Sequence, residues 1–115
     1  MHELAITENI LRTALAAGKE AGAKKITEIK LVIGKLNGFV PDCVQEYFDV
    51  LSENTMAEGA KINFDIIETK ITCMECGLST NIKGMRLVCE KCGSHKVEIV
   101  SGRELYIDSI EIEEN

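Results

Sequence analysis

Two Cys-x-x-Cys-Gly segments constrain this chain of 115 residues more than any other feature of its sequence. They occupy residues 73–77 and 89–93, and twelve residues separate the last cysteine of the first from the first cysteine of the second. Two residues between paired cysteines let both sulfurs converge on one metal ion, and the following glycine permits a positive φ. Four thiolates form the closed tetrahedral set of a structural zinc site. We predict one zinc ion bound by Cys73, Cys76, Cys89 and Cys92.

The composition is that of a folded protein from a reducing compartment. Hydrophobic residues make up 45% of the chain, which supports a core, and 28% of the residues are charged. No apolar run approaches the about 20 residues that span a bilayer. The N-terminus carries Glu3 and Glu8 and does not read as a signal peptide. Because four of the five cysteines have metal-binding spacing, we expect a cytoplasmic protein with no disulfide framework and no membrane contact.

The formal net charge of −6 hides an asymmetry along the chain. Residues 70–96 hold five basic and two acidic side chains, a local charge of +3, so the remaining residues carry −9. Four thiolates and one Zn²⁺ add about −2, which part of the basic excess offsets. The acidic remainder argues against nucleic acid as the main partner.

Two segments have the periodicity of amphipathic helices. The first runs from residue 4 to about residue 21 and meets a stop signal at Gly22. Its expected apolar stripe comprises Leu4, Ile10, Leu11, Ala14, Leu15 and Gly18. The second begins at Pro41, which suits a first helical turn, and should end near residue 54. Its expected apolar stripe comprises Val44, Tyr47, Phe48 and Leu51.

Four segments predict β-strands. Residues 26–34 and 62–66 alternate between apolar and polar side chains, and residues 97–100 suit a short ribbon strand. Residues 105–112 are too apolar to be covered by a small metal-held ribbon, so we expect them to pair with the two earlier strands. The expected fold class is α+β, with two helices packed on a small three-stranded sheet and an inserted zinc-ribbon module. The domains are then residues 1–70 with 101–115, and residues 71–100.

Candidates for catalysis are poor. The chain has no Ser-His-acid set and no phosphate-binding glycine loop, and it has only two histidines, His2 and His95. Cys43 is interpreted as a small buried apolar residue of the second helix, and His95 is expected to face solvent. A zinc ion held by four cysteines leaves no open position for a substrate. We therefore predict that the protein is not an enzyme.

The N-terminus combines several nitrogen donors within three residues. Met1-His2-Glu3 offers an α-amine, backbone amide nitrogens, an imidazole and a carboxylate. Backbone nitrogen and imidazole in a square-planar array suit Ni²⁺ or Cu²⁺. The bulky second residue should keep the initiator methionine in place, which preserves the amine as a ligand. By itself this pattern leaves both a metal site and an ordinary frayed terminus open.

Several motifs occur together in a particular order. They are Met1-His2-Glu3-Leu4, Ile33-Gly34 with the loop into Val40-Pro41, Glu58-Gly59-Ala60, the two cysteine pairs, and Gly102-Arg103-Glu104-Leu105 closing on Ser109-Ile110-Glu111. In this combination the chain resembles the HypA (HybF) family of hydrogenase-maturation proteins, essentially from end to end.

The resemblance implies a nickel metallochaperone that helps insert Ni²⁺ into [NiFe] hydrogenase and in some members also supports urease. Met1, His2 and Glu3 match the family's nickel-binding start, and the four cysteines match its structural zinc ligands. The implied partners are a nickel-handling GTPase and, as final recipient of the metal, the hydrogenase large subunit. We expect a monomer or a weak homodimer.

Two functions from other classes use the same cysteines. A zinc-ribbon nucleic-acid-binding protein would use the local positive charge, but residues 70–96 contain no aromatic side chain on which a base could stack. A rubredoxin-like electron-transfer protein would hold iron in the four thiolates, but both cysteine segments lack the aromatic packing expected around such a site. Salt-dependent nucleic-acid binding or a visible absorption band would identify these alternatives.

Overall fold

The structure is a computed structural model that describes residues 3–114 and forms two compact units. The first unit comprises residues 3–32, 39–65 and 106–114, and the second comprises residues 33–38 and 66–105. The second unit is thus inserted into the first by chain order. No helix among residues 3–114 is long and apolar enough to cross a bilayer.

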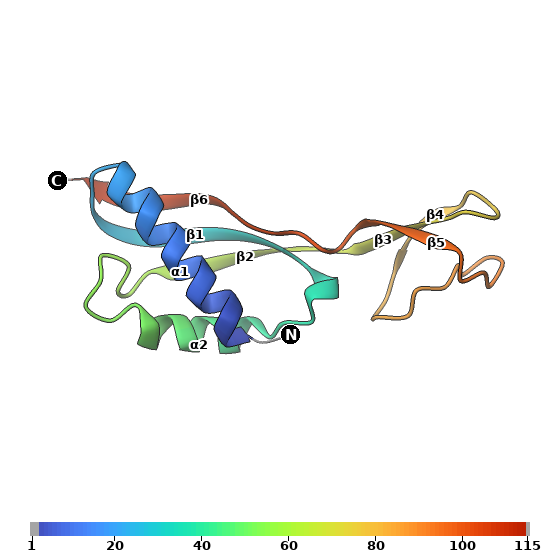
Figure 1. Ribbon diagram of the computed structural model, residues 1–115, viewed down its shortest axis with the longest axis horizontal. Helices are drawn as coiled ribbons and strands as arrows, with labels where there is room; N and C mark the ends of the chain where they lie inside the picture. Colours follow the sequence, from blue (N-terminus) through green and yellow to red (C-terminus); the bar gives the residue numbers. More distant parts are fainter. Residues whose placement is uncertain (1–2, 115) are drawn as a thin grey trace. The chain divides into compact units, whose positions relative to one another are not determined.

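A three-stranded sheet with the order β2-β1-β6 forms the base of the first unit. Its strands are β1 (Ala23–Gly34), β2 (Lys61–Ile67) and β6 (Leu105–Glu114). Figure 1 shows β1 and β2 running in the same direction, joined through α2 (Pro41–Leu51), while β6 returns in the opposite direction. The expectation that the last apolar segment pairs with the earlier strands is confirmed.

Both helices, α1 (Glu3–Glu20) and α2, cover the same face of this sheet (Figure 1). The helices pack against each other, and the alternation of β1 turns its apolar side chains toward them. Fully buried side chains from these elements make the core, and they include Ile26, Ile29, Leu31, Val44 and Phe48. The predicted fold class, α+β with two helices on a three-stranded sheet, is therefore confirmed.

The predicted stripes of the two helices were wrong at one position each. Leu4 is 45% exposed and Tyr47 is 44% exposed. The core-facing residues of α1 begin at Ile6 and not at Leu4. They include Thr7, a polar residue that is fully buried. Its hydroxyl donates a hydrogen bond of 2.6 Å to the carbonyl of Glu3, so burial leaves it satisfied.

The predicted end of the second helix, near residue 54, was too late. α2 ends at Leu51, and the N–H of Ser52 still bonds to the carbonyl of Phe48 at 2.9 Å. Asn54 then adopts a φ of 63°, a left-handed conformation that interrupts any continuation of the helix.

The second unit holds a small antiparallel sheet with the order β4-β3-β5. Its strands are β3 (Thr69–Cys73), β4 (Ser79–Ile82) and β5 (Val97–Ser101), and a short 3-10 helix, η1 (Lys35–Asn37), belongs to the same unit. The strand predicted at residues 97–100 is confirmed as β5. Strands β3 and β4 were not predicted. In the sheet, Ile71 of the central strand β3 pairs with Thr80 of β4 on one side and with Ile99 of β5 on the other.

Two glycines far apart in sequence bring backbone against backbone within the second unit. The N–H of Gly34 donates to the carbonyl of Glu104 at 2.7 Å, and the N–H of Leu36 donates to the carbonyl of Gly102 at 2.8 Å. A Cβ at Gly34 would lie 2.0 Å from the carbonyl carbon and oxygen of Gly102. Only a residue without a side chain fits this crossing.

Replacing Gly34 with alanine should therefore destabilise the protein by about 3 kcal/mol, because the obstacle is backbone and cannot rotate away. Gly38→Ala is a matched control, since Gly38 has a φ of 60° but no heavy atom within 4 Å of the added carbon. It should cost only the about 1 kcal/mol of a left-handed residue. Denaturant unfolding of both variants checks this, and equal losses would contradict it.

Candidate metal centre

Both cysteine pairs adopt the same local conformation. In the first pair, the N–H of Cys73 donates to the carbonyl of Leu78 at 2.8 Å, and the N–H of Gly77 donates to the carbonyl of Cys73 at 3.0 Å. The second pair repeats both bonds at the same sequence offsets, at 2.9 Å each. The reversal needs a positive φ, and the two glycines supply it: φ is 76° at Gly77 and 74° at Gly93.

These turns bring four sulfur atoms together. All four Sγ atoms lie within 4.8 Å of one another, and the Cys73–Cys92 and Cys76–Cys89 pairs lie at 3.6 Å. A disulfide would need about 2.05 Å. A tetrahedron with Zn–S bonds of about 2.3 Å places its sulfurs about 3.8 Å apart. The cluster therefore has the size and donor set of a structural zinc site.

Backbone N–H groups favour thiolates within the cluster. The N–H of Cys76 lies 3.4 Å from the Sγ of Cys73 and lowers the pKa of Cys73 to about 6. The N–H of Cys92 likewise lowers the pKa of Cys89. The N–H of Ser94 acts in the same direction on Cys92, but hydrogen bonds to the neighbouring sulfurs and the desolvation of its Sγ outweigh it and raise the pKa of Cys92 to about 12. A divalent cation supplies the charge that allows all four thiols to ionise.

The cluster also closes the second unit. The first cysteine of each pair is buried and the second is exposed, so one side of the site faces the interior. The interior is small, with Ile33, Ile71 and Ile82 as its buried aliphatic side chains. The N–H of Met74 donates to the carbonyl of Lys96 at 2.8 Å and links the first cysteine pair to the chain after the second. In so small a unit the metal takes the place of a larger apolar core.

The other residues singled out from the sequence lie outside this cluster. His95 is exposed, as expected, whereas Cys43, which was expected to be buried, is half-buried on α2. The carboxylate of Glu3 accepts a hydrogen bond of 3.2 Å from the N–H of Val40, a contact that the sequence did not indicate. Met1 and His2 lie outside the described residues, so the assignment of nickel to them stays a prediction.

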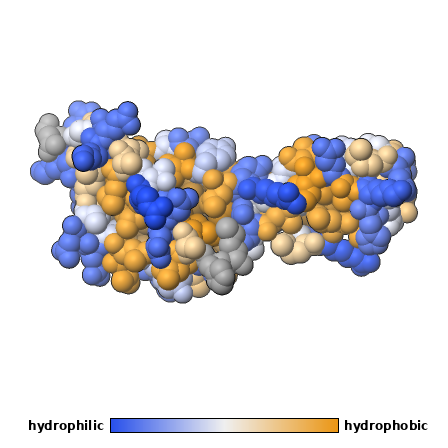
Figure 2. All heavy atoms as spheres, viewed as in Figure 1, coloured by the Kyte–Doolittle hydropathy of each residue, from blue (hydrophilic) through white to orange (hydrophobic). Residues whose placement is uncertain are grey.

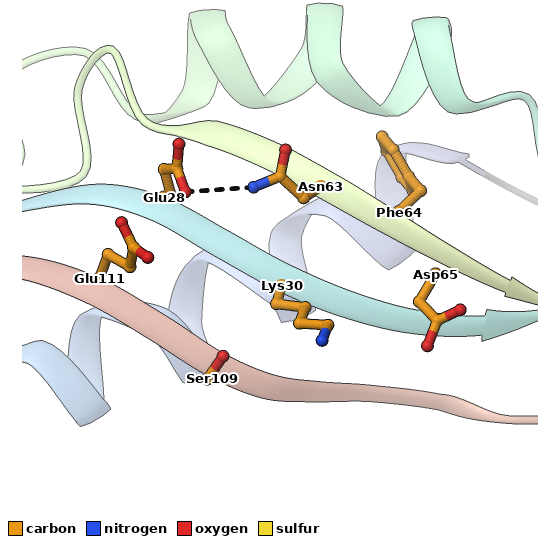
Figure 3. A pocket seen from close by; sticks show the side chains of 7 residues that line it. All are labelled: Glu28, Lys30, Asn63, Phe64, Asp65, Ser109 and Glu111. Carbon is orange, nitrogen blue, oxygen red and sulfur yellow. Dashed lines mark hydrogen bonds between the residues drawn. The ribbon is translucent and has the colours of Figure 1, made fainter.

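A polar cavity of about 230 Å³ lies on the sheet face away from the helices (Figure 3). In this cavity the side-chain amide of Asn63 donates to the carboxylate of Glu28 at 3.3 Å. Among residues 3–114, only the four cysteines bring their ligand atoms close enough to hold a metal ion. The cavity is therefore not a candidate metal site. Its lining residues are Glu28, Lys30, Asn63, Phe64, Asp65, Ser109 and Glu111.

The chain is similar to known proteins of one family along nearly its whole length. A family model described as "Hydrogenase/urease nickel incorporation, metallochaperone, hypA" matches residues 1–112. A hydrogenase maturation factor HypA from Dehalococcoides mccartyi is 44% identical over 114 residues, which covers 99% of this chain and 96% of that protein. A protein of the same name from Caldanaerobacter subterraneus subsp. tengcongensis is 38% identical over 114 residues, covering 98% of this chain and 100% of that protein.

A solved structure shares the fold. The solution structure of the Ni metallochaperone HypA from Helicobacter pylori superimposes with a TM-score of 0.68 at 21% identity, and the match covers 100% of both chains.

Replacing Cys73 or Cys89 with serine should abolish zinc binding and unfold the second unit, because metal binding and local folding are one equilibrium here. Metal analysis should fall from one zinc per chain to none, and the amides of β3 and β5 should lose protection from hydrogen exchange. Cys43→Ser is the control and should keep its zinc. Zinc retained in Cys73→Ser, or lost in Cys43→Ser, would show that the ligand set is wrong.

Proposed function

The chain belongs to the HypA family of nickel metallochaperones for hydrogenase maturation, and we propose that it binds Ni²⁺ at its N-terminus and delivers it to [NiFe] hydrogenase. The observation that carries this proposal is that the family match begins at residue 1, where Met1-His2-Glu3 concentrates the nitrogen donors. The match over residues 1–112 also favours nickel handling over nucleic-acid binding or electron transfer.

The proposed nickel ligands are the α-amine of Met1, the imidazole of His2 and backbone nitrogen, a set that suits square-planar Ni²⁺. Glu3 lies in the first described turn of α1, where amide groups have no partner within a helix. Its amide nitrogen is therefore the donor that we assign to nickel. Its carboxylate instead accepts the N–H of Val40, which fixes the start of α1 against the start of α2.

The four-cysteine site does not suit a metal ion that must be delivered to another protein. Its four Sγ atoms lie within 4.8 Å of one another, so an ion bound by all four has no open position, and two of the cysteines are buried. A metal that must be passed on needs open coordination positions and exchangeable ligands. We therefore assign zinc a structural role and nickel the transported role. The nickel-binding domain is then residues 1–70 with 101–115, and the zinc-binding domain is residues 71–100.

The proposed role is binding and transfer and involves no catalysis. By analogy with the family, the nickel passes to a nickel-handling GTPase, and the hydrogenase large subunit is its final recipient. We place this exchange in the cytoplasm, where cysteines remain reduced and able to bind zinc. The protein acts there as a monomer or weak homodimer.

Replacing His2 with glutamine should abolish tight Ni²⁺ binding while zinc content and thermal stability stay almost unchanged. Glutamine is large enough to keep Met1 in place, and the first core residue of α1 is Ile6. A peptide tag fused ahead of Met1 should have the same effect, because it converts the amine into an amide. Isothermal titration with Ni²⁺ on untagged protein measures both.

His95→Gln is the matched control, since it removes the chain's other histidine, which is exposed. It should bind Ni²⁺ as tightly as the unaltered protein. Tight binding by the tagged protein, with the same stoichiometry, would place the nickel elsewhere.

Nickel affinity should also fall by at least about 100-fold between pH 8 and pH 6, because the amine and the imidazole alone account for that much and the coordinated amide of Glu3 releases a further proton. An α-amine with a pKa near 7.7–8.0 and an imidazole with a pKa near 6.5 must both lose a proton to bind the metal. Protonation therefore competes with nickel as the pH decreases. Competition titrations at several pH values check this, and an affinity that stays flat would point to carboxylate ligands.

A further inference from the structure

Helix α2 carries a second apolar row beside the one that enters the core. Val44 and Phe48 are fully buried. The neighbouring row follows the spacing i, i+3, i+7 and i+10, which places its members on one side of the helix. Val40 is 50% exposed and Val50 is 65% exposed, Tyr47 is exposed to a similar degree, and Cys43 is half-buried. We call these four residues the α2 apolar row: Val40, Cys43, Tyr47 and Val50.

The first residue of this row, Val40, lies beside the first turn of α1. The hydrogen bond from Val40 N–H to the carboxylate of Glu3 joins the two helix starts, and the exposed Leu4 follows Glu3 directly. Figure 2 shows hydrophobic side chains gathered on this face of the first unit. A soluble domain gains nothing by exposing a tyrosine and several aliphatic residues together, and such patches mark interaction sites. Tyrosine is also among the side chains that dominate binding energy at interfaces.

The charges beside the row have one sign. Helix α2 contains Asp42, Glu46 and Asp49 but no lysine or arginine, and Glu53 follows it. These four residues recur at helical spacing on the side of α2 opposite the core, next to the apolar row. The first unit, counted over residues 3–32, 39–65 and 106–114, has fourteen acidic and six basic side chains, a net charge of −8. The negative electrostatic field of the first unit therefore attracts a basic partner.

We infer that the α2 apolar row docks a basic amphipathic helix of a partner protein. Apolar side chains of that helix cover Tyr47 and Val50, and its lysine or arginine residues face the acidic row of α2. A second copy of this chain would bring like charges together, and an anionic membrane would be repelled. The inference rests on the proposed function for its purpose, because a partner docked here would lie beside the turn that follows the nickel-binding terminus.

A synthetic peptide of about 18 residues, with leucine on one face and lysine on its flanks, is a suitable probe. Fluorescence anisotropy with full-length, zinc-loaded protein should show binding, and a peptide with glutamate in place of lysine should not bind. Tyr47→Ser should weaken binding by about tenfold or more. Tyr106→Ser is the matched control, because Tyr106 is a 53% exposed tyrosine on β6 of the same unit, and it should leave binding unchanged.

The same variants separate docking from nickel binding. Tyr47→Ser should bind Ni²⁺ as the unaltered protein does, yet cells whose only copy is Tyr47→Ser should make nickel-deficient hydrogenase, and Tyr106→Ser cells should not. If the unaltered protein failed to bind Ni²⁺, the proposed function would fall while the peptide result would stand. Equal peptide binding by both variants, or by both peptides, would overturn the docking inference. Loss of a homodimer in Tyr47→Ser, or binding of the unaltered protein to phosphatidylserine vesicles, would also overturn it.

Discussion

The second unit depends on the attraction between four thiolates and one divalent ion. Its strands are short, its buried aliphatic side chains are few, and the two cysteine pairs come from turns that no helix supports. The backbone N–H groups that point at Cys73 and Cys89 prepare two of the four sulfurs for ionisation. The pKa of Cys92, in contrast, is raised. All four thiols are therefore ionised together only when a bound cation balances their negative charge.

The proposed nickel site has a different chemistry. Sulfur donors in a closed tetrahedron hold zinc firmly, whereas an amine, an imidazole and amide nitrogen suit the planar coordination of Ni²⁺. Protons compete for an amine and an imidazole near neutral pH, so we expect the proposed nickel site to exchange its metal more readily than the four thiolates exchange zinc. Under the proposed function, the hydrogen bond between Glu3 and Val40 is relevant to delivery, because it holds the first described turn of α1 beside the start of the α2 apolar row.

The parts that sequence analysis predicted are those encoded by neighbouring residues. The spacing of the cysteine pairs and the glycine after each pair were enough to assign the cluster, because each turn is local. Periodicity located both helices, but it could not decide which of two adjacent rows of α2 faces the core, so Tyr47 was misplaced. The crossing of Gly34 and Gly102 joins residues far apart in the chain, and neither glycine signals the other in the sequence. β4 is short and polar and is held by pairing with β3, which periodicity does not detect.

X-ray absorption at the zinc and nickel edges of one sample tests the separation of the two metals most directly. The sample is untagged protein loaded with one equivalent of each ion. The zinc edge should show four sulfur neighbours at about 2.3 Å. The nickel edge should show only nitrogen or oxygen neighbours in a planar arrangement. Sulfur in the nickel shell, or nitrogen in the zinc shell, would contradict the assignment of structural and transported metals to separate sites.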